Sequence, residues 1–240
     1  MKGVGETSSI WLREPPAPSR SSPLSRERIV GAAVDVLDRH GTHGLTMRRL
    51  AEALGVTATA LYWHVKTKED VLDLALDHIF ADVPLREPTP DWEDDVRHLL
   101  RNWRAVMLQH PWAPTLIGRP MLGPRVLART EFLQSALQRG GFVEVSLAVL
   151  TRVLANYVIG AALTEATFRG TPESQARAQA RRHITANPAA YPVLNASGHL
   201  DADRWNDDEL FDRGLDAILA ATPTKEQNPP RPGVNSQPLR

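Results

Sequence analysis

Apolar residues recur along this chain at intervals of three and four, which is the period of an α-helix with one buried face. No stretch shows the sustained alternation of apolar and polar residues that is typical of strands, and no internal repeat is present. The pattern therefore predicts an all-α fold.

Helix starts and stops follow from the residues that flank each apolar segment. The predicted N-terminal caps, whose side chains can accept backbone N–H groups, are Ser25, Thr46, Thr57, Thr67 and Asp91. Gly41 and Gly55 end the first two helices, because glycine adopts the left-handed conformation at a C-terminus without strain. The later helices are predicted over residues 91–110, 125–139, 143–168, 172–186 and 207–221.

The two ends of the chain have a different composition from its middle. Residues 1–22 and 223–240 are rich in proline, serine, glycine and polar residues without periodicity, so we expect tails without stable structure. Trp11 is interpreted as an isolated hydrophobic residue in the first tail.

Charge is balanced overall but unevenly distributed. The chain has 28 basic and 28 acidic residues, whereas residues 1–68 hold ten basic against six acidic ones. A basic front on an acidic body suits contact with a polyanion at one end. There is no cysteine, which excludes disulfides and thiolate zinc sites.

One segment, Val145 to Leu163, is apolar enough to be considered as a membrane span. Arg152 and Asn156 lie near its centre, where polar groups are costly in lipid. The N-terminus has no apolar core of the kind found in signal peptides. We therefore interpret the segment as a buried helix and expect a soluble, cytoplasmic protein with no membrane partner.

Two short predicted helices joined through Gly55-Val56-Thr57 form a helix-turn-helix pattern. Leu61 and Val65 can pack on the preceding helix, which leaves the opposite face of the second helix exposed. In a DNA-binding unit that face enters the major groove.

The second helix ends in three large rings. We expect Tyr62 and His64 to donate to phosphates and Trp63 to be an interior anchor that packs toward the first and fourth helices. The alternative is that all three rings are ordinary core residues of a helical bundle.

At this point the sequence resembles the tetracycline-repressor (TetR) family of transcriptional regulators. The resemblance is densest over "RIVGAAVDVLDRHGTHGLTMRRLAEALGVTATALYWHVKTKEDVLDLAL", residues 28–76, and "LYWHVKTK" is similar to the founding tetracycline repressors. It continues more loosely through "YPVLNASGHLDADRWNDDELFDRGLDAIL" and covers residues 24–221 in all.

The resemblance implies a homodimer. Each subunit would have a DNA-binding domain over residues 23–69 and a larger regulatory and dimerisation domain over residues 70–222. The helices over residues 143–168 and 207–221 would form the dimer interface. The partner would be a palindromic double-stranded operator, because a two-fold dimer presents two equivalent reading heads. A small-molecule effector would release the repressor from DNA.

By position, the resemblance places DNA contacts at Arg48, Thr57, Ala58, Thr59, Tyr62, His64 and Lys68. Ala58 departs from the founding repressors, which carry an amide there. Arg48 is then the best candidate for bidentate recognition of guanine, since threonine and alanine methyls can contact only thymine methyls.

The founding repressors hold magnesium–tetracycline through two histidines and an asparagine, and a rough alignment puts Pro84, Leu99 and Ile117 at those places. None of these side chains can bind a metal, so we expect neither tetracycline nor any metal or cofactor. We expect instead a largely apolar or aromatic effector, bound between helices. The candidate pocket residues are Trp103, Met107, Trp112, Leu116, Met121, Phe132, Asn156 and Tyr157. Glu165 is a further candidate polar group, although a surface or interface role suits it and Asn156 equally.

Two other classes of function stay open on the sequence. The chain could be a dimeric DNA-binding regulator without a small-molecule ligand, controlled by a protein partner or by its own level. It could also be an all-α enzyme, but no nucleophile elbow and no zinc-binding histidine spacing is present, so we predict no enzyme. A ligand-accessible cavity would favour the ligand-responsive regulator, and a filled core would favour the second class.

Overall fold

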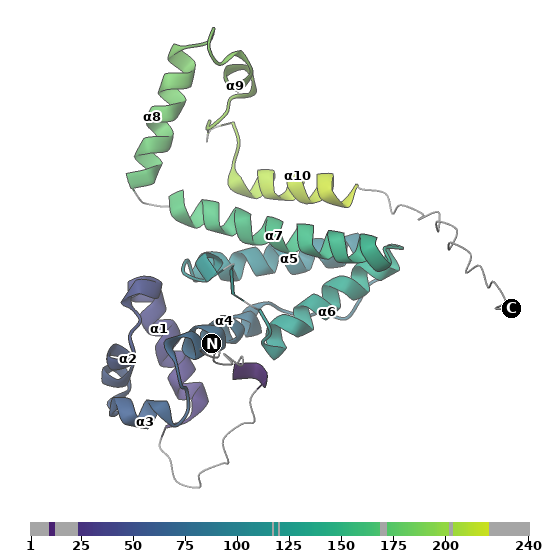
Figure 1. The fold of residues 1–240 in the computed structure, drawn as a ribbon. Coiled ribbons are helices and arrows are strands. Elements are labelled where there is room, and N and C mark those ends of the chain that lie inside the picture. Colours follow the sequence, from purple (N-terminus) through teal and green to yellow (C-terminus); the bar gives the residue numbers. More distant parts are fainter. Residues whose placement is uncertain are drawn as a thin grey trace, which may run out of the picture.

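The computed structural model describes residues 10–12, 24–116, 118–119, 121–168, 172–201 and 204–220, and every regular element among them is helical, as predicted. Figure 1 shows three groups of helices. The first group is α1 (Arg26–Gly44), α2 (Met47–Leu54), α3 (Ala58–Tyr62) and α4 (Lys68–Ile79). The second is α5 (Trp92–Gln109), α6 (Pro124–Arg139), α7 (Glu144–Phe168) and α10 (Asp207–Leu219). The third is α8 (Pro172–Ala186) and α9 (Pro192–Ser197).

The predicted caps form as expected at the first helices. The hydroxyls of Ser25, Thr46 and Thr67 accept backbone N–H groups at 3.2, 3.1 and 3.0 Å respectively. Gly55 ends α2 in the left-handed conformation, with φ 67°. Gly41, with φ 64°, interrupts the helical geometry inside α1 at the predicted end. Local sequence signals therefore determine these boundaries.

One hydrophobic core runs through the first two groups. α4 packs on α1 and on α6, while α5 packs on both α6 and α7. The apolar residues predicted to face inward from α4 are all buried, namely Val71, Leu72, Leu74, Ala75, Leu76 and Ile79. Helix α4 thus connects the helix-turn-helix to the helical body.

Three segments differ from the prediction. Helix α3 ends at Tyr62, before the expected end of the apolar segment at Val65, and the short helix α9 was not predicted. Residues Ile10–Leu12 form a 3₁₀ turn in which Ile10 is buried and Trp11 packs against the core, so Trp11 is not an isolated hydrophobic residue. The rest of the two predicted tails lies outside the described residues.

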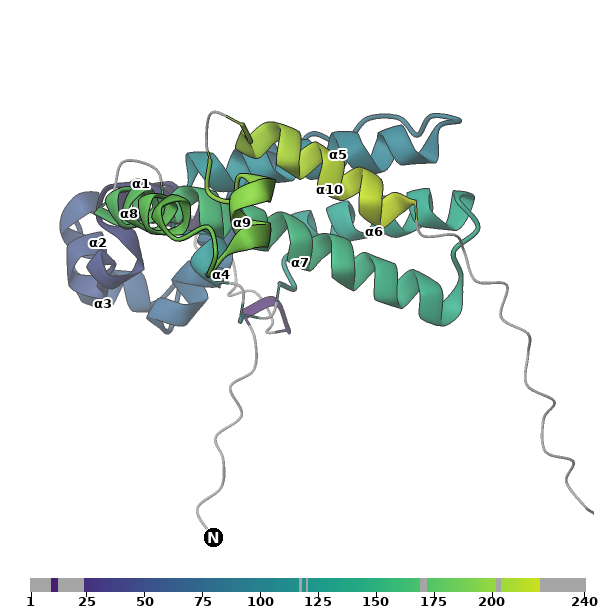
Figure 2. The same cartoon turned by 90° about the horizontal axis from the view of Figure 1, so that it is seen from above.

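Helices α8 and α9 form an arm that stands away from the other helices in Figure 1 and is seen nearly end-on in Figure 2. Tyr191, Val193 and Leu194 on the arm are exposed apolar side chains within the subunit. These three apolar side chains of the arm are therefore not covered by the rest of the subunit.

Helix α7 is not the buried helix that its composition predicted. It is long and apolar enough to cross a membrane, but only 28% of its apolar window is buried in the subunit. Leu150, Leu154 and Val158 face the core, whereas Val145 and Val149 are 61% and 55% exposed. The predicted and observed burial of α7 differ because hydropathy alone does not distinguish packing within a subunit from packing against another surface.

Buried charges join the helices of the body. Asp95, which is fully buried, accepts hydrogen bonds from Arg86, Thr89 and Arg139. Burial by itself would raise the pKa of Asp95, but the hydrogen bonds from Thr89 and Arg86 outweigh it and hold that pKa below its ordinary value. Asp95 therefore stays ionised and fixes the α4–α5 loop against α6.

Candidate nucleic-acid interface and ligand pocket

The outer face of α3 is exposed as the helix-turn-helix pattern predicted. Leu61 and Val65 are buried beneath it, and Thr59 and Tyr62 face outward, with Tyr62 51% exposed. Trp63 is 79% exposed, so its prediction as an interior anchor is wrong. Helical residues advance by about 100°, which places Trp63 about 200° from Leu61 and on the opposite side of the helix from the core.

Thr57 and Ala58 lie at the start of α3. The Thr57 hydroxyl accepts the Ala60 N–H at 3.3 Å, so this side chain caps the helix while remaining exposed. Ala58 is half-buried and packs against the core. The exposed side chains at the start of α3 are therefore the two threonines, Thr57 and Thr59, whereas the Ala58 methyl group partly faces the core.

Arg48 projects from α2 and is exposed. Its Nε donates to Glu52 Oε1 at 2.9 Å, one turn along the same helix. An exposed pair of this kind contributes little stability, so the guanidinium can leave Glu52 for a base edge at small cost. Arg48 therefore remains the candidate for recognising a DNA base from this surface.

His64 and Lys68 are both half-buried rather than freely exposed. Lys68 Nζ donates to the carbonyl oxygen of Thr42 at 2.8 Å and so ties the start of α4 to the end of α1. The Lys68 ammonium therefore holds α4 to α1. Its contact with a DNA phosphate stays a prediction.

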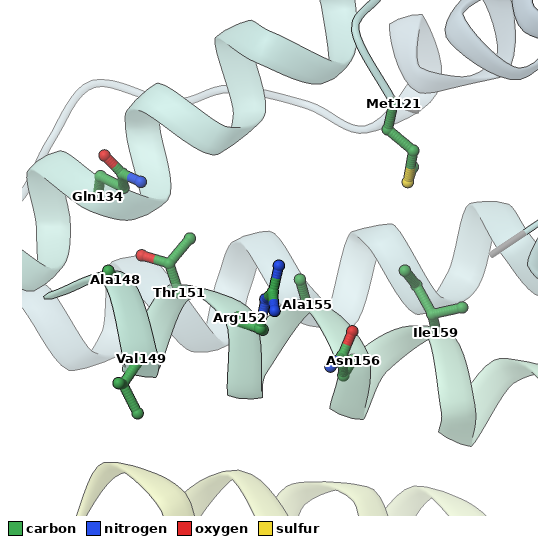
Figure 3. Close-up of a pocket in the computed structure, with 9 residues that line it drawn as sticks. All are labelled: Met121, Gln134, Ala148, Val149, Thr151, Arg152, Ala155, Asn156 and Ile159. Carbon is green, nitrogen blue, oxygen red and sulfur yellow. The ribbon is translucent and has the colours of Figure 1, made fainter. Parts of the chain in front are cut away.

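An open pocket of about 610 Å³ lies between α6 and α7 (Figure 3), and its α7 wall includes side chains that are exposed to solvent in the subunit, namely Ala148, Val149, Arg152 and Asn156. It contains two of the predicted ligand-binding residues, Met121 and Asn156. The prediction missed Gln134 on α6 and Arg152 on α7, which also line it. A signal for Arg152 was present, since it lies one turn before Asn156 on the same helix face.

The other predicted pocket residues do not line this pocket. Trp103 packs edge-to-face on Phe80 with ring centroids 5.0 Å apart, and Met107 and Leu116 are also buried in the core. Phe132 is half-buried and packs against the same core. Periodicity marked these positions correctly as inward-facing, but most inward positions meet other side chains rather than a cavity.

Two of the predicted pocket aromatics have polar partners elsewhere. The Trp112 Nε1–H donates to Asp38 Oδ1 of α1 at 2.7 Å. The Tyr157 hydroxyl donates to the carbonyl oxygen of Phe211 at 3.0 Å, and its ring stacks on that of Phe211. Trp112 and Tyr157 thus hold helices together. Glu165 likewise does not reach this pocket, because it pairs with Arg104 of α5.

Polar contacts connect the helix-turn-helix group to the helices around the pocket. Asp77 of α4 accepts the backbone N–H groups of Arg125 and Val126, at 2.8 and 3.1 Å, in the first turn of α6. Arg119 donates to Asp73 of α4 at 2.7 Å. These hydrogen bonds link α4 directly to the first turn of α6 and to the segment that precedes it.

The positions aligned with the founding repressors' metal site offer no metal ligand in the described part of the chain. Leu99 is buried, Pro84 is exposed, and Ile117 lies outside the described residues. Within the described ranges no three histidine, aspartate or glutamate side chains are grouped so that they could hold a metal ion.

The chain matches two protein-family models. Residues 29–75 match the model described as bacterial regulatory proteins, tetR family, and residues 83–223 match the tetracyclin repressor-like C-terminal domain. An HTH-type transcriptional regulator of Saccharopolyspora erythraea is 42% identical over 219 residues, covering 90% of this chain and 92% of the relative. The class C tetracycline repressor protein of Escherichia coli is 29% identical over 204 residues, covering 82% of this chain and 89% of the repressor.

A solved structure of similar fold is that of the TetR-family protein ActR from Streptomyces coelicolor, in complex with actinorhodin. Its TM-score is 0.74 at 28% sequence identity, and the match covers 83% of this chain and 95% of ActR.

Proposed function

The chain belongs to the TetR family of DNA-binding transcriptional regulators, and from this we propose that it is a homodimeric, cytoplasmic repressor that a small, largely apolar ligand releases from a palindromic operator. The exposed outer face of α3, next to the exposed Arg48, is the observation that carries the proposal. A solvent-facing short helix with threonine, tyrosine and tryptophan side chains is suited to a major groove and its flanking phosphates.

A second subunit is supported by the uncovered side of α7. Val145, Val149 and Val153 are spaced one turn apart and form an exposed apolar stripe, and Leu210 of α10 is exposed as well. Val149 also lines the edge of the pocket, so the stripe and the pocket adjoin on α7. An isologous interface buries the same stripe on both subunits. The two α3 helices of such a dimer would meet two equivalent half-sites.

The pocket between α6 and α7 supports control by a small molecule over control by a protein partner alone. Its wall includes α6, whose first turn is bound to Asp77 of α4. A ligand that displaces α6 would therefore shift α4 and the attached helix-turn-helix. For a hundredfold loss of operator affinity, the ligand must favour the released conformation by about 2.7 kcal/mol.

Selection of bound duplexes from a random pool tests the proposed function. We expect the dimer to enrich a palindrome with half-sites about one helical turn or a multiple apart. Affinity for the enriched duplex should fall linearly with salt on logarithmic axes, because phosphate contacts release counterions. Equal affinity for enriched and random duplexes at moderate salt would refute a sequence-specific regulator.

We expect Arg48→Ala to lose discrimination at one base pair in each half-site, at a cost of roughly 1–3 kcal/mol. His64→Ala, by contrast, should weaken every duplex about equally and flatten the salt dependence, because a phosphate contact carries no base preference. Affinities for all single-base variants of the enriched site measure both effects.

Arg39→Ala is the matched control, because Arg39 is an exposed arginine of α1 paired within its own helix to Asp35. It should leave the base preference unchanged. A uniform weakening by Arg48→Ala across all variants would show that Arg48 contacts phosphate and not a base.

A further inference from the structure

Two side chains of the helical body meet one carboxylate of α1. The Trp112 Nε1–H donates to Asp38 Oδ1 at 2.7 Å, and His110 Nδ1 lies 2.8 Å from the same oxygen. An ionised carboxylate only accepts hydrogen bonds, so His110 Nδ1 is the donor in this pair. These two hydrogen bonds, called the Asp38 contact below, connect α1 directly to the segment that follows α5.

The two donors of the Asp38 contact are held by the turn on which they lie. His110 is the residue that ends α5, and Pro111 after it has one backbone angle fixed by its ring. The Trp112 carbonyl oxygen accepts the Thr115 hydroxyl at 2.6 Å. Both donors therefore reach Asp38 from a backbone with little freedom.

Burial makes the contact necessary for Trp112. The Trp112 side chain is buried, and a buried N–H donor is nearly always bonded. The side chains of His110 and Asp38 are 14% and 34% exposed, so water reaches the pair only from one side. Loss of the carboxylate would leave the indole N–H without its partner in the protein.

The Asp38 contact is on a different helix from the other polar links to the body. Arg119 donates to Asp73 of α4, and Asp77 of α4 accepts the Arg125 N–H. Links along α4 alone restrain the helix-turn-helix group only weakly against turning about the axis of that helix. A link on α1, which packs beside α4, opposes this rotation.

We propose that Asp38 is a positioning residue for DNA binding, which fixes the orientation of the α3 face relative to the body and so sets the half-site spacing that the dimer accepts. The inference rests on the proposed function, because half-site spacing has a meaning only for a dimer on a palindrome. Asp38 lies on neither α2 nor α3, so it acts on spacing and not on base preference.

The geometry of the duplex relates spacing to the Asp38 contact. One base pair added between the half-sites turns one half-site about the duplex axis by about 35° relative to the other. The helix-turn-helix group has to reorient on the body to follow this rotation. Reorientation separates Asp38 from His110 and Trp112, so the contact disfavours every spacing except one.

Operators with one base pair added to, or removed from, the centre of the enriched palindrome test this role on the full-length dimer. The measured quantity is the spacing penalty, which is the ratio of the affinity for the enriched operator to the affinity for the altered one. We expect Asp38→Ala to lower the spacing penalty about five- to tenfold, the contribution of one hydrogen bond to a charged group, because the contact no longer has to be broken. Preference among single-base variants within a half-site should stay unchanged.

Three further variants test the contact itself. Trp112→Phe keeps an aromatic ring in the core but removes the N–H donor, so it should also lower the spacing penalty. Asp38→Asn keeps an oxygen acceptor and should restore most of the penalty. Adding Trp112→Phe to Asp38→Ala should lower the penalty no further, because the bond between the two residues is already absent.

Asp35→Ala is the matched control. Asp35 is an exposed aspartate on the same helix, three residues before Asp38, and it pairs with Arg39 of α1. Its removal should leave the spacing penalty unchanged.

Every other outcome decides against the inference or against the function beneath it. An equal loss of affinity at all spacings in Asp38→Ala would overturn the inference, because it would show a general structural role. A changed base preference would also overturn it, since Asp38 would then act at the DNA. If circular dichroism shows that Asp38→Ala does not fold, the spacing penalties of Trp112→Phe and Asp38→Asn decide in its place. A protein that enriches no palindrome would refute the repressor, whereas an enriched palindrome with the same spacing penalty in all variants would refute the role of Asp38 alone.

Discussion

Replacing Val145 and Val153 together by glutamate is expected to convert the dimer into a folded monomer whose operator affinity falls by about a hundredfold or more. Both side chains belong to the exposed stripe of α7, so the subunit itself loses little packing. At a two-fold interface the change places four carboxylates on one apolar seam, where unpaired charges are costly. A monomer also loses the increase in operator affinity, roughly 10²–10⁴-fold, that comes from linking two DNA-binding domains in one dimer.

Light scattering and duplex titration measure the two halves of this prediction. Leu127→Glu is the matched control, because Leu127 is an exposed leucine of α6 outside the stripe. It should leave both the dimer and the operator affinity intact. A double variant that remains dimeric with full affinity would move the interface away from α7.

The largest expected effect on stability comes from Glu165→Leu. Glu165 of α7 accepts two hydrogen bonds from Arg104 of α5, at 3.0 and 2.5 Å, and both side chains are buried. Without Glu165, Arg104 keeps only Asp208 among its bonded carboxylates, and the side chain of Asp208 is 87% exposed. Breaking one side of a buried ion pair costs about 3–5 kcal/mol, so we expect a loss of that size in the free energy of unfolding.

Urea unfolding at one fixed protein concentration measures this loss, because dimer stability depends on concentration. Asp212→Ala is the control on the same pair of helices, since it breaks a half-exposed pair with Arg101 and should cost less than about 1 kcal/mol. The double variant Arg104→Met, Glu165→Leu should recover most of the stability, because it leaves no unpaired buried charge. If Glu165→Leu and Asp212→Ala lowered the free energy of unfolding equally, the buried Arg104–Glu165 pair would contribute no more stability than the exposed one.

Parts of the fold could be predicted because they depend on neighbours in sequence. The caps at Ser25, Thr46 and Thr67 bond to groups only three residues away. The turn at Gly55 needs a left-handed residue whatever surrounds it. The same local rules placed α2 and α3 next to each other and directed Leu61 inward.

The candidate ligand site could be predicted only in part. Met121 and Asn156 were among the predicted residues, but Arg152 and Gln134 were not. An apolar position on a helix looks the same in sequence whether it meets a cavity or another side chain. Trp103 and Met107 show the difference, since both face inward and both are enclosed by the core.

The sequence by itself determined the all-α fold, the helix-turn-helix and the family, because hydrophobic period, caps and the turn glycine act over a few residues. Only the tertiary structure decided that Trp112 binds Asp38, that Glu165 pairs with Arg104 and that Arg152 lines the pocket between α6 and α7. Asp38 and Trp112 are 74 residues apart in the chain, and Arg104 and Glu165 are 61 apart. Contacts at such separations depend on how whole helices pack, and a side chain's own neighbours in sequence carry no record of which distant group it will meet.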